Sequence, residues 1–195
     1  MSDEFLRIKQ EVLNCKKCSL YKTRKNPVFG EGSLKARIVF IGEAPGYNED
    51  LLGKPFVGRA GKFLDELLDS INLSRNEIFI TNILKCRPPN NRDPLELEIK
   101  ACSPYLDEQI NIIKPRIIVT LGNFSTRFIL KKFSISPQQI TKIHGKVFRI
   151  KNLIYDVVVI PMFHPAAALY NPNMKQTMFD DFEILREELN KIKEK

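Results

Sequence analysis

Four short runs of β-branched apolar residues constrain the fold of this chain more than any other feature. They are RIVFIG at 37–42, IFITNI at 78–83, RIIVTLG at 116–122 and VVVIPMF at 157–163. Their apolar residues are consecutive, not alternating, which is typical of strands buried on both faces of a parallel sheet. Because helical patterns lie between the runs, we predict right-handed crossovers. The expected fold class is a three-layer α/β/α sandwich around a central four-stranded, mainly parallel sheet.

The connecting segments predict where the helices lie. Residues 60–71 place apolar side chains at helical spacing, and further helices should begin at Asn123 and near Lys175. Asp93 as N-cap, Pro94 at the first position and Glu96 three residues after the cap predict another helix start. Residues 146–159 predict an antiparallel hairpin that turns near Lys151 and Asn152 and leads into the last strand.

Length and charge narrow the class of protein. The 195 residues fit one domain, 1–195, and no apolar run approaches the roughly 18 to 20 residues of a membrane helix. The start MSDEFLRIKQ has no apolar signal-peptide core, so we expect a cytoplasmic protein without membrane contact. Lys and Arg exceed Asp and Glu by 31 to 23, a net charge of +8 that favours a polyanion such as nucleic acid. Because basic proteins are common, the charge alone does not establish nucleic-acid binding; a binding site must support that inference.

The four cysteines suggest a metal or cluster site. They are Cys15, Cys18, Cys86 and Cys102, a C-x2-C pair followed by two distant single cysteines. In a reducing compartment such a set is more typical of a metal or cluster site than of disulfides. Four thiolates suit zinc or a 4Fe-4S cluster equally well on these grounds, and inert buried thiols or a redox pair are the alternatives.

The loops that follow the four predicted strands carry most of the chemistry. Open parallel sheets bind ligands at the carboxyl ends of their strands. Three of the four loops there are rich in Gly, Pro, Asn or His: residues 42–62, 81–94 and 163–172. Turn formation alone accounts for such residues at any one loop. Their gathering on one edge favours a shared site.

Together these features resemble the family 4 uracil-DNA glycosylases, which carry a 4Fe-4S cluster. The resemblance extends from Cys15 to Leu169. It rests on the cysteine spacing and on GEAPG at 42–46, GKPFVGRAG at 53–61, TNILKCRPP at 81–89 and HPAAAL at 164–169. It implies one 4Fe-4S cluster per chain, rather than zinc, on Cys15, Cys18, Cys86 and Cys102, tying the N-terminal segment to the core. It also implies a monomeric DNA repair enzyme that flips uracil out of single- or double-stranded DNA and hydrolyses its N-glycosidic bond, with repair or replication partners unspecified.

Three side chains fit the needs of this reaction. An extruded base needs a face to stack on, which Phe56 supplies, and a reader of its edge. The Asn82 amide donates to uracil O4 and accepts from N3, a pattern that cytosine reverses. His164 is the candidate donor to uracil O2, where negative charge develops on the leaving base. A core Phe, a turn Asn and a structural His are the alternative interpretations.

The loop after the first strand completes the predicted site. Gly42, Glu43 and Ala44 should border the uracil, with backbone amides near Glu43 as further donors and its carboxylate as a second catalytic group. Family 1 enzymes carry an Asp and a Tyr where Ala44 and Gly46 stand. Without that Asp, stabilisation of the leaving group should dominate the mechanism. By analogy with the family, Glu49 excludes the thymine methyl.

The remaining candidates contact DNA outside the pocket. Leu169 is a candidate apolar wedge for the space left by the flipped base, with core packing as the alternative. Five cations of the loops are candidate phosphate contacts, with solvated charge as the alternative: Arg59, Lys62, Lys85, Arg87 and Arg92. His144 is predicted to be a loop residue near DNA.

Three other functions compete with this prediction. A family 5 glycosylase acts on a wider range of deaminated bases, and Glu43 together with HPAAAL favours family 4. A non-enzymatic iron–sulfur protein that binds nucleic acid would need neither Asn82 nor His164. An electron-transfer protein would need an accessible cluster and no base pocket.

Overall fold

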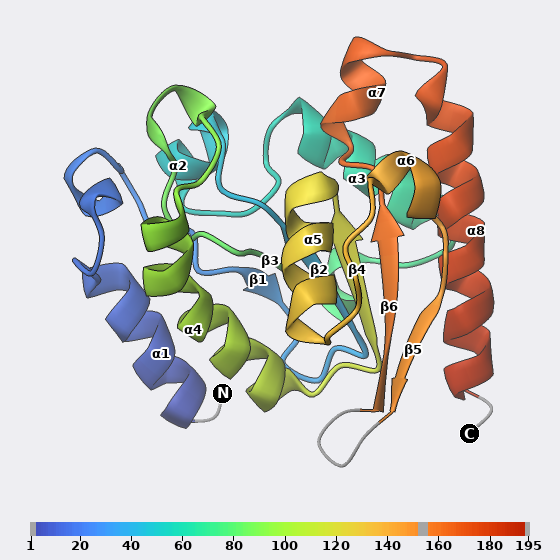
Figure 1. The fold of residues 1–195 in the computed structure, drawn as a ribbon, viewed down its shortest axis with the longest axis horizontal. Helices are drawn as coiled ribbons and strands as arrows, with labels where there is room; N and C mark the ends of the chain where they lie inside the picture. The colour runs from blue at the N-terminus through green and yellow to red at the C-terminus, as the bar shows by residue number, and fades with distance from the viewer. Residues whose placement is uncertain (1–2, 152–155, 194–195) are drawn as a thin grey trace.

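A six-stranded mixed sheet forms the centre of the molecule in the computed structural model, which describes residues 3–151 and 156–193 (Figure 1). The strands are β1 (Glu31–Gly32), β2 (Ile38–Gly42), β3 (Phe79–Asn82), β4 (Ile117–Leu121), β5 (Phe148–Lys151) and β6 (Asp156–Met162). Their order across the sheet is β1-β3-β2-β4-β6-β5. The four middle strands run parallel, and the two edge strands run antiparallel to their neighbours.

The four apolar runs are therefore the four parallel strands, as predicted. The hairpin prediction is also confirmed by the antiparallel pairing of β5 with β6, although its turn at 152–155 lies outside the described residues. Strand β1 was not predicted, because two exposed residues carry no periodicity.

Helices cover both faces of the sheet. Figure 1 shows α1 (Asp3–Asn14), α4 (Glu96–Ile113) and α5 (Asn123–Lys132) on one side, with α3 (Arg59–Ser70) and α8 (Met174–Lys193) on the other. Three short helices complete the fold: α2 (Tyr47–Leu52), α6 (Ile140–Ile143) and α7 (Ala166–Tyr170). In β2, Val39 and Ile41 pack with the first group, whereas Ile38 and Phe40 pack with the second. Both faces are thus apolar, which is why the strand carries a continuous apolar run.

The predicted start of α4 is wrong by a few residues. The helix begins at Glu96, and its N-cap is Leu95, not Asp93. Glu98 reaches back to accept the Leu95 N–H at 2.9 Å, so a residue inside the helix supplies the capping carboxylate. Pro94 lies before the helix.

None of the helices described is both long enough and apolar enough to span a bilayer.

Candidate active site and cysteine cavity

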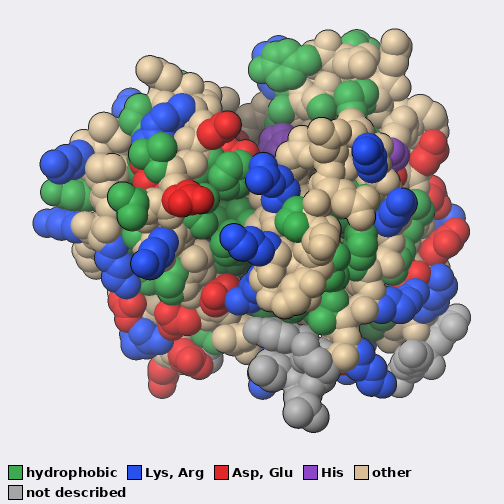
Figure 2. All heavy atoms as spheres, viewed as in Figure 1, with side chains coloured by type: hydrophobic (Ala, Val, Ile, Leu, Met, Phe, Trp, Pro, Cys, Tyr) green, Lys and Arg blue, Asp and Glu red, His purple; other side chains and the backbone are tan. Residues whose placement is uncertain are grey.

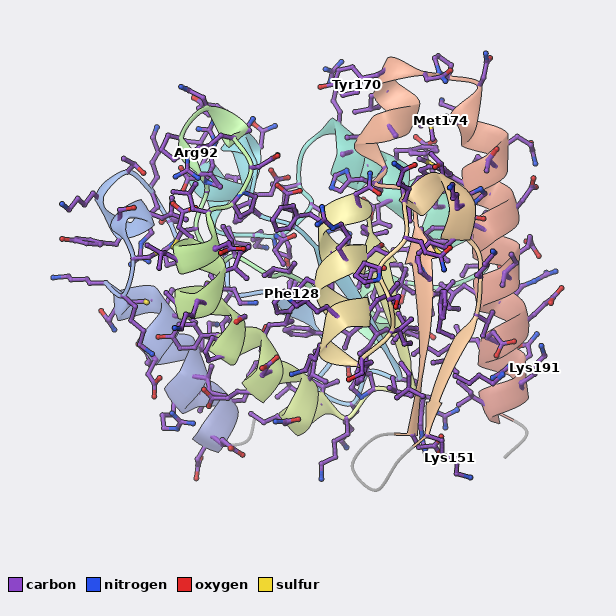
Figure 3. The ribbon with its side chains drawn as sticks, viewed as in Figure 1. Arg92, Phe128, Lys151, Tyr170, Met174 and Lys191 are labelled. Carbon is purple, nitrogen blue, oxygen red and sulfur yellow. The ribbon has the colours of Figure 1, made fainter. Side chains whose placement is uncertain are left out.

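A cavity of about 310 Å³ opens at the carboxyl ends of the parallel strands. It gathers residues that are distant in the sequence, from the loops after β2, β3 and β6. Six predicted site residues line it: Glu43, Ala44, Glu49, Phe56, Asn82 and His164. Figure 2 shows a notch in this edge of the surface, and Figure 3 places Arg92 and Tyr170 on its two sides.

Gly42 lies beneath the cavity and lets its walls approach one another. A Cβ at Gly42 would lie 2.3 Å from Asn82 Oδ1 and 3.0 Å from the Phe56 ring. Any side chain here would displace both neighbours. Gly42 therefore contributes to the site by its lack of a side chain.

The Asn82 carboxamide is buried and makes no hydrogen bond with the described part of the chain. The residue is 2% exposed, ends β3 and lines the cavity. Its backbone carbonyl accepts a hydrogen bond from Lys85 Nζ at 2.7 Å. An amide that faces a cavity and has no protein partner is available to a ligand, and leaving it unpaired there would be costly.

His164 is held as a neutral imidazole. Burial lowers its pKa to about 4, and Glu49 opposes the shift. The Ala166 N–H donates to Nδ1 at 3.1 Å, so Nδ1 is the acceptor and the proton lies on Nε2. Gly122, with φ +93°, packs against this side chain, since a Cβ there would lie 3.2 Å from His164 Cβ. The ring can therefore offer Nε2–H as a neutral donor.

Phe56 combines stacking with a strained backbone. Its ring stacks on the His164 imidazole at a centroid distance of 5.5 Å and 28° between planes, which leaves at most one face for a base. Its φ of 51° is in the left-handed region, which non-glycine residues rarely occupy. Such a conformation persists only where surrounding contacts impose it.

Arg75 supplies several of those contacts from a 3₁₀ helix, Arg75–Glu77, outside the cavity. Its guanidinium donates to the carbonyls of Phe56 at 2.7 Å, Pro55 at 3.2 Å and Gly61 at 3.3 Å, and it pairs with Asp65. Gly61 is required for this packing, because a Cβ there would lie 1.8 Å from the Phe56 carbonyl oxygen.

Glu49 holds the same loop from the other side. One carboxylate oxygen accepts the N–H groups of Val57 at 2.9 Å and Gly58 at 3.0 Å. The other lies 2.7 Å from where a Cβ of Gly46 would stand. Glu49 thus fixes the loop in addition to lining the cavity, and exclusion of thymine by this side chain stays a prediction.

Glu43 presents a carboxyl group that makes no hydrogen bond among the described residues. Burial raises its pKa, and the nearby Asp93 adds to the shift. A carboxyl group with a raised pKa is suited to exchange a proton with a water molecule.

Lys85 corrects one prediction. The side chain is 1% exposed and donates to Thr81 Oγ1, the Asn82 carbonyl and Gln109 Oε1, each at 2.7 Å, so it does not lie where phosphate could reach it. Burial lowers its pKa to about 7. A lysine in a polar loop was expected to be exposed, and the acceptor that changes this, Gln109, comes from α4.

The other predicted DNA contacts lie around the cavity. Arg59 and Lys62 are exposed on α3, and Leu169 is 38% exposed on α7. Arg87 is partly buried, with its guanidinium 5.2 Å from the Tyr47 ring centre. Contact of these residues with DNA stays a prediction.

Two further predicted residues have partners within the protein. Arg92 lines the cavity and forms a two-point ion pair with Glu98, at 2.9 and 2.6 Å, and its contact with phosphate stays a prediction. His144 Nδ1 lies 3.0 Å from both carboxylate oxygens of the buried Asp181, which packs it against α8.

Sequence reasoning missed several lining residues. They are Pro45, Ala60, Pro88, Asn91 and Ala166. Gly46 was considered only as the counterpart of the family 1 Tyr, and Arg92 only as a candidate phosphate contact. Asn90 and Asn91 have φ values of 55° and 53°. The PPNN sequence of 88–91 signals this tight loop, since Asn tolerates such values, but it does not say which side chains face the cavity.

The four cysteines line a second, much smaller cavity of about 10 Å³; Cys86 and Cys102 are buried, and Cys15 and Cys18 are partly exposed. All four are free thiols, drawn from the N-terminal segment, the loop after β3 and helix α4. Arg24 Nη1 donates to Cys86 Sγ at 3.1 Å, and the Lys85 N–H donates to Cys102 Sγ at 3.2 Å.

This donor set fits an iron–sulfur cluster chemically. Four thiols share one apolar cavity, and N–H donors aimed at sulfur are a means by which proteins tune such clusters. Burial raises the pKa of the Cys102 thiol to about 11, and the Lys85 ammonium opposes the shift. Among residues 3–151 and 156–193, no three His, Cys, Asp or Glu side chains are placed to hold a single metal ion.

Comparison with known proteins identifies relatives. A sequence model of the uracil DNA glycosylase superfamily matches residues 29–189. The chain is 54% identical over 186 residues to the type-4 uracil-DNA glycosylase of Sulfurisphaera tokodaii, covering 95% of this chain and 84% of that protein. It is also 54% identical over 184 residues to the type-4 uracil-DNA glycosylase of Saccharolobus solfataricus, covering 94% and 85%. A type-5 uracil-DNA glycosylase of Pyrobaculum aerophilum is 30% identical over 155 residues, covering 72% and 66%.

Proposed function

The chain belongs to the uracil DNA glycosylase superfamily, and from that premise we propose that it flips uracil out of DNA and hydrolyses its N-glycosidic bond. The products are free uracil and an abasic site. One observation carries the proposal: the cavity brings the unpartnered Asn82 carboxamide together with the neutral His164 donor. The higher identity to type-4 than to type-5 enzymes supports uracil as the main substrate.

Uracil recognition depends on Asn82. The carboxamide at the strand end donates to O4 and accepts from N3–H, whereas cytosine presents the opposite groups at both positions. Binding cytosine would leave polar groups of the cavity unpaired, and this cost gives strong discrimination against it. The open face of Phe56 adds stacking.

Bond cleavage depends on His164. As the N-glycosidic bond breaks, negative charge builds on the uracil and positive charge on the sugar. The neutral ring stabilises the charge on O2 through a hydrogen bond from Nε2–H, without transferring its proton to the base. Glu43 is the group suited to orient water toward the sugar.

The cysteine cavity holds a 4Fe-4S cluster in this proposal. The cluster would join Cys15 and Cys18 of the N-terminal segment to Cys86 and Cys102, a structural link beside the loop that carries Asn82. Protein purified without oxygen should contain about four irons per chain and be brown. One zinc per chain and no colour would refute the cluster and leave the four ligands in place.

Incubation with a uracil-containing oligonucleotide, followed by alkali, tests the activity directly. Strand scission is expected only at uracil, and matched oligonucleotides with thymine or cytosine should stay intact. The doubly substituted Asn82→Ala/His164→Ala protein is the control for contaminating enzyme. Scission by both proteins, or by neither, would contradict the proposal. Cytoplasmic location, a monomeric state and protein partners stay predictions.

A further inference from the structure

A groove of about 730 Å³ runs between α4 and α5. It is separate from the cavity of about 310 Å³ that contains Asn82 and His164, called the uracil cavity below after its proposed ligand. Its floor is apolar and includes the partly buried side chains of Ile99, Phe124 and Phe128. Figure 3 shows Phe128 between the two helices, and Figure 2 shows apolar side chains in this hollow with Lys and Arg beside it.

The charge around the groove is strongly positive. Lys100, Arg127 and Lys131 are exposed, and none of them forms an ion pair within the described part of the chain. Lys132 also lines the groove but is paired with Asp107 at 2.9 Å. Glu96 is the one carboxylate among the lining residues described. Three unpaired cations around an aromatic floor favour an anionic, ring-containing ligand.

The groove begins at the edge where the uracil cavity opens. Pro94, in its lining, follows two residues after Arg92 of the cavity. On the other wall, Phe124 follows two residues after Gly122, which packs against His164. Both walls of the groove therefore begin close to residues of the cavity, so a strand whose uracil occupies the cavity can extend toward the groove.

We propose that this groove binds the single-stranded DNA next to the flipped uracil. Bases stack on Phe124 and Phe128, and phosphates contact Lys100, Arg127 and Lys131. Aromatic faces interleaved with cations are the usual means of holding single strands without reading sequence. The proposal rests on the proposed function, because it assigns the groove to the uracil-bearing strand.

Binding of single strands of two lengths tests the proposal. The probes are five- and fifteen-nucleotide strands with one 2′-fluorodeoxyuridine, which slows cleavage, and anisotropy is measured over a range of salt concentrations. Lys100→Gln/Arg127→Gln/Lys131→Gln should bind the longer strand about 100-fold more weakly at about 0.1 M salt. The slope of log affinity against log salt should fall by about 2. The five-nucleotide strand should bind as it does to the parent.

Lys35→Gln/Arg37→Gln/Lys151→Gln is the matched control. Like the groove triple, it removes two Lys and one Arg, here from exposed residues near the other end of the parallel strands. The dependence of affinity on salt should stay unchanged for both the short and the long strand. Phe124→Leu/Phe128→Leu keeps the apolar packing but removes the rings. It should weaken binding of the longer strand without changing the salt slope.

The position of the uracil sharpens the test. Since the groove leaves the cavity on one side, the loss should appear with the uracil near one end of the longer strand and not near the other. Equal binding by the groove and control triples would overturn the proposal and leave the groove to another partner, such as an acidic peptide. Failure of the parent to cleave uracil would overturn the proposed function instead, because the binding measurement does not need cleavage.

Discussion

The uracil cavity and the cysteine cavity lie on either side of one short segment, Thr81–Cys86, yet they treat polar groups in opposite ways. The uracil cavity is open, about 310 Å³, and leaves the Asn82 carboxamide and the Glu43 carboxyl group without described protein partners. The cysteine cavity is far smaller, about 10 Å³, and supplies N–H donors to Cys86 and Cys102. In the proposed function, the first cavity binds uracil from solution, and the second holds a cluster that stays with the protein.

Lys85 connects the two regions. Its side-chain ammonium donates to the Asn82 carbonyl and to Thr81 Oγ1, while its backbone N–H donates to Cys102 Sγ. The position of the recognition amide therefore depends on the chain beside the cysteines. Substitutions should separate the regions: those in the cysteine cavity should reduce stability and activity together, and those in the uracil cavity should reduce activity alone.

The largest effect is expected from Cys86→Ser/Cys102→Ser. Loss of two ligands should abolish iron binding and lower the free energy of unfolding by about 4 kcal/mol or more. For a chain of this size, that is a fall of roughly 8 to 16 °C in Tm. Iron analysis and calorimetry measure both. Full iron content with unchanged Tm would remove these cysteines from the site and erase the contrast between the cavities.

His164→Ala should have the next largest effect, on chemistry alone. Removing one donor to a developing oxyanion costs about 3 kcal/mol, or roughly 10² to 10³ in the single-turnover rate, with Tm nearly unchanged. His164→Gln keeps a neutral N–H donor and should recover part of the rate. Glu43→Gln should cost less than His164→Ala. The reverse order would favour activation of water by the carboxylate as the main source of catalysis.

Asn82→Ala should reduce uracil cleavage by about 100-fold while general DNA affinity stays the same, since phosphate contacts are untouched. Cleavage kinetics and binding to a uracil-free strand are measured side by side. Asn82→Asp is the informative companion, because it keeps the acceptor but loses the donor to O4. Parent-like activity in Asn82→Ala would remove this residue from recognition.

Arg75→Lys should have a smaller effect, about tenfold in kcat/KM, although Arg75 lines no part of the uracil cavity. A lysine keeps the charge but cannot donate to the three carbonyls that fix the left-handed Phe56. If free uracil inhibits the variant more weakly than it inhibits the parent, the loss lies in stacking of the base on Phe56. Arg59→Lys is the control. A lower Tm with unchanged kcat/KM and uracil inhibition would show that Arg75 serves stability only.

These expectations also show what the sequence can reveal. The four parallel strands were predictable because each is apolar on both faces, and Asn82 and His164 because they end or directly follow such strands. The burial of Lys85 was not, since it depends on Gln109, 24 residues away. The role of Arg75 was hidden for a related reason. Its acceptors are also distant in the sequence, and because they are backbone carbonyls, no residue type signals them.

The smallest expected effect is an absence of pH dependence where histidine usually titrates. The ordinary pKa of His is about 6.5, whereas burial lowers that of His164 to about 4. The ring therefore stays neutral down to about pH 5, and the single-turnover rate should change less than about twofold between pH 8 and 5. Below about pH 4 the protonated Nδ1 would face the Ala166 N–H, donor against donor, and the rate should fall.

Because the unfolded His binds a proton near pH 6.5, the contribution of His164 to stability is complete above that pH and declines as the pH falls toward 4. Glu43 also titrates with a raised pKa, so the profile is measured in Glu43→Gln. The ¹⁵N shifts of His164 should report a neutral Nε2–H ring at pH 7. An inflection of the rate near pH 6.5 in that variant would mean that water reaches His164 more freely than its burial implies, and the recognition role of a neutral ring in the uracil cavity would lose its support.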